Sequence, residues 1–350
     1  MLPFDPYIPV GDKVISAEHP VFIIAEAGVN HGGDLDLALK LIDVAVEAGA
    51  DAVKFQSFRA EHLILDSVSK APYQTKTTSA SESQFDMLKR LEVTREQNQK
   101  LMDYCKQKGI IFLTTPFEEV SLDELDELDL DAYKIASTDT TNIPFLEKVA
   151  RKGKPMFLST GMTHLGELAK VLDYIYPINQ QVVLLACTAN YPIKDEEANL
   201  RTIDAYHEHF DCLVGYSDHS VGVGAAPYAV PMGAVVLEKH FTTSKELEGP
   251  DHRASLSPDE LGQFVKDVRR IETYLGSPHK LPTLSELRTR ASLQKGMVAT
   301  RAIAKGELFS TENIIGKRTG GKGISPLYFY EVVGQPAPRD FEANDIIDVV

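Results

Sequence analysis

Short apolar runs alternate with amphipathic stretches along the first three quarters of the chain. Eight such runs recur, each bounded by glycine, proline or a polar cluster, which is typical of strands buried on both faces. Between them, apolar residues at helical spacing followed by glycine predict helices over 34–48 and 94–108. The predicted strands span 21–26, 52–56, 110–116, 132–137, 155–161, 182–188, 213–219 and 234–241.

This alternation predicts the fold class. Eight strands and intervening helices between residues 21 and 275 match the ~250 residues of a (β/α)₈ TIM barrel. An open doubly wound sheet usually has fewer strands, and no G-x-G-x-x-G motif follows a strand here. We therefore expect an α/β TIM barrel over 1–276, with a long polar loop at 57–82. Further helices are predicted over 118–131, 143–152, 164–175 and 257–275.

The pattern changes towards the C-terminus. Residues 277–291 are rich in turn-forming residues and predict a linker. Beyond residue 292, short alternating stretches separated by turn sequences predict a small all-β domain over 292–350. A unit of this size would be marginally stable alone, so we expect it to dock on another surface.

Composition and charge narrow the functional classes. The chain is 43% hydrophobic and 25% charged, which is ordinary for a soluble globular protein. A formal net charge of −15 argues against nonspecific binding to nucleic acid or to an anionic membrane. The sequence shows no signal peptide and no apolar stretch of ~18–20 residues, so a cytoplasmic location is predicted. Three cysteines show no metal spacing, and Cys187, with no base visible beside it, is expected to pack in the core.

Every predicted barrel strand ends in polar side chains. Because the carboxyl ends of parallel strands meet at one mouth of a barrel, these side chains are expected to form one site. A single polar strand end is often merely solvated, but eight in succession are difficult to explain as surface. The polar residues at the strand ends are Glu26; Lys54 and Gln56; Thr114 and Thr115; Lys134 and Ser137; Ser159 and Thr160; Thr188; Ser217, Asp218 and His219; and Glu238 and His240.

Two lysines indicate what this site binds. Lys54 and Lys134 interrupt apolar strands, where an isolated ammonium group would be strongly penalised. Together with nearby hydroxyls they suit a phosphate group. The alternative is a buried Lys–Glu pair, such as Lys54 with Glu26 or Lys134 with Glu238, which need not exclude a ligand.

Two histidines at neighbouring strand ends suggest a metal site. His219 and His240, as neutral imidazoles, would leave coordination positions open for water or substrate. Nitrogen ligands alone leave Mn²⁺, Mg²⁺, Co²⁺ and Zn²⁺ as alternatives. The alternative for any one histidine is a core residue whose ring nitrogens are hydrogen-bonded within the protein.

Two further polar residues lie near the predicted mouth. His31 is followed by two glycines, which fits a turn. Asp251 follows the last strand, where its side chain could reach the mouth or the segment could simply form a turn.

Taken together, these motifs resemble the sialic acid synthase family, which includes N-acetylneuraminate, legionaminate and pseudaminate synthases. The tail from about residue 292, with Lys305-Gly306 and Lys317-Arg318, resembles the antifreeze-like (SAF, β-clip) domain of that family. The resemblance covers nearly the whole chain in the order of the family. The matching barrel motifs are Ile24-Ala-Glu26-Ala-Gly-Val-Asn30-His31, Val53-Lys54-Phe-Gln56, Thr115-Pro-Phe, Lys134-Ile-Ala-Ser137, Leu158-Ser159-Thr-Gly-Met162, Tyr191-Pro192, Ser217-Asp-His219, Glu238-Lys-His240-Phe and Gly249-Pro-Asp251.

The resemblance implies a reaction and roles for these residues. Phosphoenolpyruvate would condense with an N-acylated hexosamine aldehyde and water, giving a nine-carbon 2-keto sugar acid and phosphate. A divalent metal, Mn²⁺ first and Mg²⁺ or Co²⁺ otherwise, would bind His219 and His240 and polarise the aldehyde. Glu26 would act as acid or base, with Lys54 and His240 also catalytic. Phosphoenolpyruvate would contact Lys54, Gln56, Thr115, Lys134, Ser137, Ser159 and Ser217. The sugar would contact Tyr191, Asp251, Asp139, Asn190 and Arg318, the last from the partner subunit of a domain-swapped homodimer.

Three departures from the family pattern fall on the sugar side. Asp139 stands where a glutamate can occur, Ala189 replaces an amide, and Thr319 replaces a proline. The motifs therefore specify the phosphoenolpyruvate chemistry more closely than the sugar, for which we expect the legionaminic type ahead of the pseudaminic and N-acetylneuraminic types.

Two other functional classes remain as alternatives. One is a different phosphate-handling barrel, such as an aldolase that uses Lys134 or Lys54 to form a Schiff base. The other is a non-enzymatic surface-binding protein, because the C-terminal domain resembles ice-binding proteins.

Overall fold

The computed structural model describes residues 4–65, 67–70 and 82–349. The chain divides into two compact units, 1–276 and 277–350, and each is described separately below. No helix within these described residues is long and apolar enough to cross a membrane.

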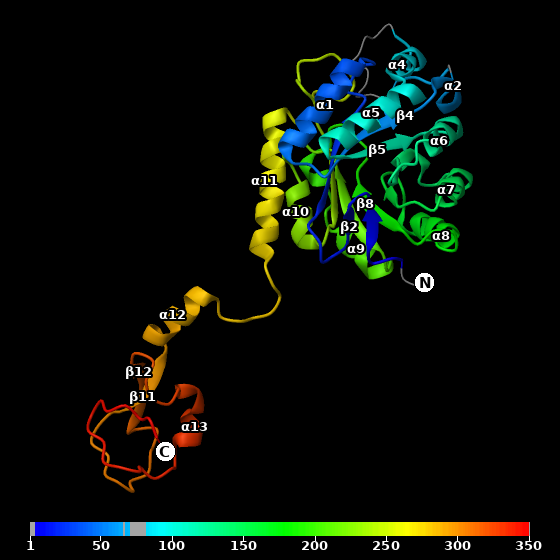
Figure 1. The fold of residues 1–350 in the computed structure, drawn as a ribbon. Helices are drawn as coiled ribbons and strands as arrows, with labels where there is room; N and C mark the ends of the chain where they lie inside the picture. The colour runs from blue at the N-terminus through cyan, green and yellow to red at the C-terminus, as the bar shows by residue number, and fades with distance from the viewer. Residues whose placement is uncertain (1–3, 66, 71–81, 350) are drawn as a thin grey trace. The chain divides into compact units, whose positions relative to one another are not determined.

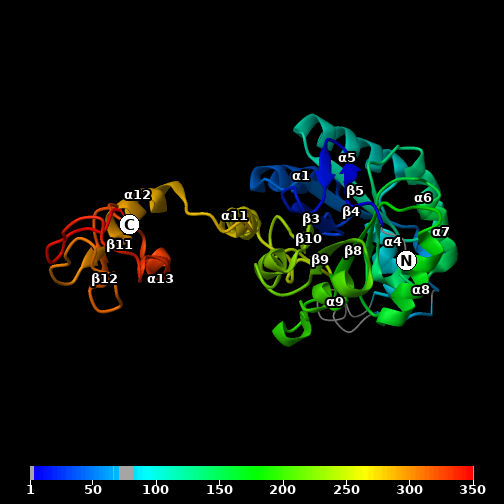
Figure 2. The same cartoon turned by 90° about the horizontal axis from the view of Figure 1, so that it is seen from below.

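The first unit is the predicted TIM barrel (Figures 1 and 2). All pairings in its eight-stranded sheet are parallel, in the order β5-β4-β3-β10-β9-β8-β7-β6, and the end strands β5 and β6 also contact each other. The strands are β3 Phe22–Gly28, β4 Ala52–Ser57, β5 Ile111–Pro116, β6 Tyr133–Ile135, β7 Met156–Ser159, β8 Val182–Cys187, β9 Leu213–Asp218 and β10 Val236–His240. Each overlaps the run that was predicted for it.

Helices surround these strands, and capping residues set where several of them begin and end. Asp34 accepts hydrogen bonds from the first turn of α1, and Gly49 ends that helix with φ +81°. Thr94 with Gln97 and Ser257 with Glu260 form capping boxes at the starts of α5 and α11. The helices are α1 Leu35–Ala48, α2 Ala60–Leu63, α4 Gln84–Leu91, α5 Arg95–Lys108, α6 Glu119–Asp126, α7 Ile143–Ala150, α8 Leu165–Ile175, α9 Thr202–His209, α10 Ala226–Ala229 and α11 Pro258–Leu275.

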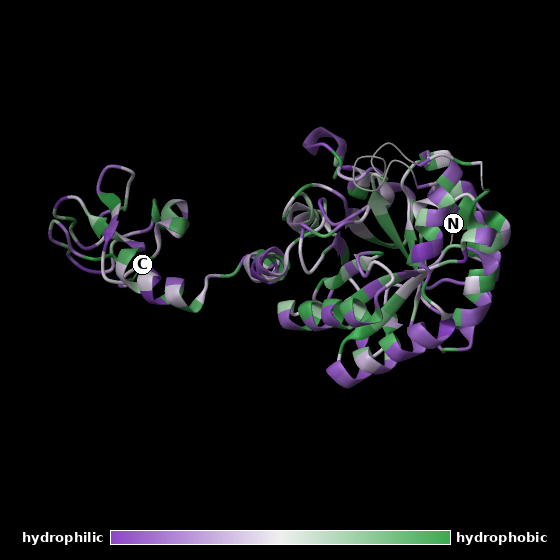
Figure 3. Ribbon diagram, turned by 90° about the horizontal axis from the view of Figure 1, so that it is seen from above, coloured by the Kyte–Doolittle hydropathy of each residue, from purple (hydrophilic) through white to green (hydrophobic). Residues whose placement is uncertain are grey.

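The hydrophobic core lies between the sheet and the helices and inside the barrel. Figure 3 shows mainly hydrophobic colour on the barrel strands, whereas the surrounding helices carry hydrophilic and hydrophobic residues in alternation. An antiparallel hairpin that was not predicted, β1 Ile8–Val10 with β2 Lys13–Ile15, adds Ile8, Val10 and Ile15 to the inner cluster of the barrel. These strands are too short for an alternating pattern to be recognised in the sequence.

Two local predictions differ from the structure. The strand expected over 132–137 keeps only residues 133–135, because Ser137–Asp139 form a 3₁₀ turn (η1). The loop expected at 57–82 includes the short helix α2, while residues 66 and 71–81 lie outside the described part of the chain.

The second unit is the small domain. Strands β11 Lys295–Ala299 and β12 Ile314–Arg318 pair antiparallel, and Val298 bridges to Ile346. Its own core includes Met297, Phe309 and Phe341. The segment expected as a linker carries helix α12 Leu284–Leu293, and the domain also holds the short turns η4 Pro326–Tyr328 and α13 Phe329–Val332.

Candidate active site

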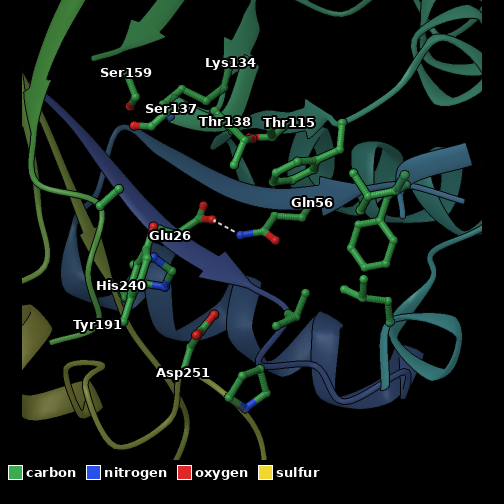
Figure 4. Close-up of a pocket in the computed structure, with 18 of the residues that line it drawn as sticks. Glu26, Gln56, Thr115, Lys134, Ser137, Thr138, Ser159, Tyr191, His240 and Asp251 are labelled. Atoms are coloured by element: carbon green, nitrogen blue, oxygen red, sulfur yellow. Dashed lines mark hydrogen bonds between the residues drawn. The ribbon is translucent and has the colours of Figure 1, made fainter. Parts of the chain in front are cut away.

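A cavity of about 540 Å³ opens at the carboxyl ends of the barrel strands. Figure 4 shows Glu26 near its centre, with Lys134 and Ser159 along one side and His240 and Asp251 on the other. Thirteen residues that the sequence placed in the site line this cavity: Glu26, Lys54, Gln56, Thr115, Lys134, Ser137, Ser159, Tyr191, Ser217, His219, Glu238, His240 and Asp251. Four other polar residues expected at the strand ends do not line it: Thr114, Thr160, Thr188 and Asp218. The barrel therefore brings most, but not all, of the strand-end residues together.

Strand register explains why the charged groups meet. In the parallel sheet, Glu26 is paired with Lys54 on one side and with His240 on the other. A bulge follows Glu26, and a Cβ at Gly28 would lie within 3.3–3.4 Å of Glu26, Gln56 and His240 side-chain atoms. Glycine at this position, with φ +54°, therefore allows the three side chains to approach one another.

Two buried lysines and two buried carboxylates form the floor of the cavity. Lys54 Nζ lies 2.8 Å from Glu26 Oε2 and 3.7 Å from Glu238 Oε2, and it donates to Thr115 Oγ1 at 3.0 Å. Lys134 Nζ lies 3.6 Å from Glu238 Oε1. The Lys–Glu pairs considered as an alternative are therefore present, and they lie within the proposed ligand site itself.

Burial and these charges shift the pKa of each group. Burial raises the pKa of Glu26 to about 7, although the neighbouring Lys54 opposes the shift. Burial also acts to raise the pKa of Glu238, but Lys134 and Lys54 outweigh it and hold this pKa near 2. Burial lowers the pKa of Lys134, with Glu238 opposing. Glu26 is therefore the carboxyl of this group that can exchange a proton near neutral pH.

Hydroxyl groups complete the lysine side of the cavity. Ser159 is 2% exposed, and its Oγ has no hydrogen-bond partner among the described residues. Ser217 donates to Glu238 Oε1 at 2.8 Å, and Ser137 Oγ accepts the Gly161 amide at 3.0 Å. A buried hydroxyl without a partner is costly unless a ligand satisfies it, which favours an anion beside the two lysines.

The two histidines lie together on the opposite side. The ring centroids of His219 and His240 are 5.5 Å apart, and Tyr191 packs against both rings. His219 Nδ1 lies 2.8 Å from the carbonyl oxygen of Thr188, which leaves Nε2 for a ligand. His240 Nδ1 is buried and has no hydrogen-bond partner within the described ranges of the chain. Burial, followed by the neighbouring His219, lowers the pKa of His240 well below its usual value, so the ring is neutral.

Burial acts to lower the pKa of His219 as well, but the neighbouring Cys187 outweighs it and raises this pKa. The two rings fit ligands of a divalent cation because each has a ring nitrogen free for coordination, and His219 would bind the cation in its deprotonated form. No cluster of three or more histidine, cysteine, aspartate or glutamate side chains in the described ranges could hold a metal. Among the histidine, cysteine, aspartate and glutamate side chains of the described residues, a cation at this site would therefore have two ligands, His219 and His240.

The remaining sugar-side residues are dispersed. Asp251 is buried at the cavity wall, and burial raises its pKa to about 6. Asp139 is buried and accepts hydrogen bonds from Asn142 and Thr138, while Asn190 is exposed, and neither lines the cavity. Arg318 ends β12 in the second unit and is exposed. The predicted sugar contacts of these three residues stay predictions.

The structure adds groups that the sequence did not assign to the site. Cys187, expected to be packing, lines the cavity with its Sγ 3.8 Å from His219 Nδ1, so the expectation that no base lies beside it is wrong. An apolar wall consists of Val29, Phe58, Leu63, Ile64, Met87, Leu88, Leu91 and Phe117. The wall draws on α2 and α4, whose approach to the mouth depends on tertiary packing rather than on strand order.

A buried histidine near the mouth yields a prediction about pH. His31 is 2% exposed and lies outside the cavity lining, and its Nδ1 accepts the Gly33 amide at 3.0 Å. Burial lowers its pKa to about 4, although Asp34 opposes the shift. The unfolded chain would bind this proton near pH 6.5, so stability is lost as pH falls from 6.5 towards 4.

Between pH 6.5 and 4, the free energy of unfolding of His31→Asn should therefore fall by about 3 kcal/mol less than that of the wild-type protein. Urea unfolding of both proteins at several pH values measures this difference. Parallel pH profiles for the two proteins would contradict a neutral buried His31.

Fold and site together define a TIM-barrel protein with a charged cavity at the mouth of its strands. The family model described as the NeuB family matches residues 41–280, and the model described as the SAF domain matches residues 295–348. The N,N'-diacetyllegionaminic acid synthase of Campylobacter jejuni is 43% identical over 328 residues, 93% of this chain and 98% of the relative. The enzyme of the same name from Legionella pneumophila is also 43% identical, over 95% of each chain.

A solved structure agrees with these relatives. The crystal structure of N-acetylneuraminic acid (sialic acid) synthetase from Leptospira borgpetersenii in complex with citrate is 34% identical. It matches with a TM-score of 0.72, covering 84% of this chain and 99% of that one. The chain belongs to the NeuB family, which confirms the resemblance seen in the sequence, and it carries a SAF domain. It is an enzyme, a transferase of the nonulosonic acid synthase type.

Proposed function

We propose that this enzyme condenses phosphoenolpyruvate with an N-acylated amino-sugar aldehyde and water, releasing phosphate and a nine-carbon 2-keto sugar acid. The observation that carries the proposal is a pair of buried lysines, Lys54 and Lys134, that both lie close to Glu238. Beside them is the Ser159 hydroxyl, which has no hydrogen-bond partner in the part of the chain that the structure describes. Lys54 and Lys134 would bind the phosphate as point charges, and Ser159 would donate to it. Gln56, Thr115, Ser137 and Ser217 line the same cavity and would complete the site.

This placement of the residues indicates the order in which bonds would form and break. C3 of phosphoenolpyruvate attacks the aldehyde carbon, and positive charge develops at C2. Water adds at C2, and one of its two protons is delivered to the former aldehyde oxygen. As the C–O bond to phosphate breaks, the C2 hydroxyl loses the other proton to become the keto group, and phosphate leaves with this proton and the bridging oxygen. Glu26, with a pKa of about 7, would stabilise the charge as a carboxylate and accept a proton from the attacking water. Holding both substrates in one cavity supplies the proximity that this bond formation needs.

We further propose that His219 and His240 hold a divalent cation, Mn²⁺ before Mg²⁺ or Co²⁺. Their free ring nitrogens support this assignment. When bound, the cation would supply Lewis-acid polarisation of the aldehyde carbonyl. Tyr191 packs against both rings and would restrict their rotation.

The apolar wall supports a particular class of sugar. Every charged side chain that lines the described cavity comes from a barrel strand, its end or the loop after β10, and the wall itself carries none. Acetamido methyl groups and a deoxygenated carbon would bury apolar surface there, whereas a sugar phosphate would be desolvated without a cation. This favours a 2,4-diacetamido-trideoxyhexose, as the legionaminic type requires, over a phosphorylated N-acylmannosamine.

Mass spectrometry of products tests the proposal directly. The purified enzyme, phosphoenolpyruvate and a panel of acetamido sugars should yield a nine-carbon acid, with the diacetamido deoxy sugar preferred. Heavy oxygen in the bridging position of phosphoenolpyruvate should appear in the released phosphate. Label retained in the sugar acid would exclude C–O cleavage, and borohydride trapping of a substrate on lysine would support an aldolase instead.

We also propose a homodimer in which the SAF domain of one subunit completes the barrel site of the other, with Arg318 contacting the N-acyl group. Arg318→Ala should then raise the KM for the sugar roughly ten- to a hundredfold, the effect of losing a charged hydrogen bond. Lys317→Ala, one residue earlier on β12, is the charge-matched control and should not do so.

Mixed dimers test whether Arg318 acts across subunits. Random mixing of Arg318→Ala and Glu26→Gln subunits makes about half of the dimers mixed, each with one intact site, and restores about a quarter of wild-type activity. Absence of recovery after subunit exchange has been demonstrated would contradict the swapped arrangement.

A further inference from the structure

The side-chain amide of Asn30 joins two loops at the mouth of the barrel. Asn30 is 1% exposed and lies just beyond β3. Its Nδ2 donates to the carbonyl oxygen of Phe241 at 2.8 Å and to Ser255 Oγ at 2.9 Å. Because the Phe241 carbonyl can only accept a hydrogen bond, the amide must present its nitrogen to this side.

Ser255 extends the connection to Asp251. Its Oγ donates to the Asp251 carbonyl oxygen at 2.7 Å, and its backbone N–H donates to the same oxygen at 3.1 Å. The Ala254 N–H is a third donor to this carbonyl at 3.1 Å. These bonds fix the backbone of Asp251, whose side chain lines the cavity.

Phe241 connects the same amide to the other side of the site. It directly follows His240, and its N–H donates to the Glu26 carbonyl oxygen at 3.0 Å. One buried amide therefore contacts the backbone beside His240 and, through Ser255, the backbone of Asp251. We propose that Asn30 is a positioning residue that holds the Asp251 carboxylate in the cavity for the aldehyde substrate. This inference rests on the proposed function, in which Asp251 contacts the sugar.

The chain contains a matched control for this role. Asn98 on α5 is 2% exposed, and its Nδ2 donates to Ser57 Oγ at 2.9 Å. The Oδ1 atoms of Asn30 and Asn98 both lack a hydrogen-bond partner among the described residues. Asn98 does not line the cavity. Substitution at either asparagine removes a buried amide, but only Asn30 connects to Asp251.

Steady-state kinetics of the full-length enzyme separate positioning from stability. Asn30→Ala should raise the KM for the aldehyde about tenfold, the effect of releasing one polar contact, with the KM for phosphoenolpyruvate unchanged. Asn30→Asp, which keeps the shape but presents an acceptor to Phe241, should do the same. Asn98→Ala should lower the melting temperature comparably while leaving both KM values unchanged.

A double variant tests whether Asn30 acts through Asp251. Asn30→Ala should add nothing to the aldehyde KM of Asp251→Ala, because the group it positions is already gone. Additive effects would overturn the inference, as would equal effects of Asn30→Ala and Asn98→Ala on both KM values.

Hydrogen exchange provides a readout that does not depend on turnover. Asn30→Ala should accelerate exchange of the Ala254 and Ser255 amides more than Asn98→Ala does, and unchanged exchange would overturn the inference. The wild-type product assay decides the proposed function independently. If the wild-type enzyme makes the product but Asn30→Ala changes neither the KM for the aldehyde nor the amide exchange, the positioning role is refuted and the proposed function stands.

Discussion

Replacing Lys54 by methionine is expected to lower kcat/KM for phosphoenolpyruvate by at least about a thousandfold, roughly 4 kcal/mol. Lys54 lies within ion-pair distance of both Glu26 and Glu238, and all three side chains are buried. Methionine fills a similar volume but removes the positive charge that would face an incoming anion and leaves the Glu238 carboxylate beside it. It also removes the charge that opposes the high pKa of Glu26, so Glu26 would be protonated at neutral pH and unable to accept a proton.

Lys239 provides the control for this experiment. It is 1% exposed and lies 2.8 Å from Asp218, so Lys239→Met also breaks a buried ion pair. Both substitutions should cost about 3–5 kcal/mol of stability. Thermal unfolding and assays of phosphate release compare them, and only Lys54→Met should alter the KM for phosphoenolpyruvate. A Lys54→Met enzyme with a normal KM for phosphoenolpyruvate would remove this lysine from the phosphate site.

The second large effect is expected for His240→Ala, which should reduce kcat about a thousandfold or more, the loss of several kcal/mol of Lewis-acid assistance. His240 has a buried Nδ1 without a protein partner and a neutral ring. Loss of one of two imidazole ligands should also weaken Mn²⁺ binding, which calorimetry of the protein without substrate measures directly.

His31→Asn is the matched control, because it replaces a buried imidazole outside the cavity lining. It should leave Mn²⁺ affinity unchanged. Strong chelation should abolish wild-type turnover and Mn²⁺ should restore it. Full activity under chelation, or wild-type metal affinity in His240→Ala, would eliminate the two-histidine site.

Strand-end residues of the site could be predicted because their chemistry is local to each strand. Glu26, Lys54 and His240 each follow or interrupt an apolar run, and parallel strands of a barrel all end at one mouth. Asp139 and Asn190 were assigned from motif position alone. The 3₁₀ turn after β6 places Thr138 rather than Asp139 in the cavity lining.

Contacts between side chains on distant segments could not be predicted from the local sequence pattern. Cys187 is the last residue of β8 and His219 directly follows β9, and no pattern within either segment indicates that their side chains meet. The apolar wall combines Phe58 with Met87 and Leu91, which sequence periodicity assigns to ordinary packing. Asn30 stood out in the sequence only as part of the motif that ends in His31, and its contact with Ser255, 225 positions away, is the basis for the positioning role proposed here.

The sequence by itself determined the barrel, the second small domain and the end of each strand at which the chemistry lies, because hydrophobic periodicity and strand polarity are local properties. The tertiary structure alone decided that Lys54 lies beside Glu238 as well as Glu26, that an apolar wall lines the same cavity, and that Asn30 connects to Asp251. These relations depend on strand register and barrel closure, which follow from the packing of the whole chain rather than from any one segment.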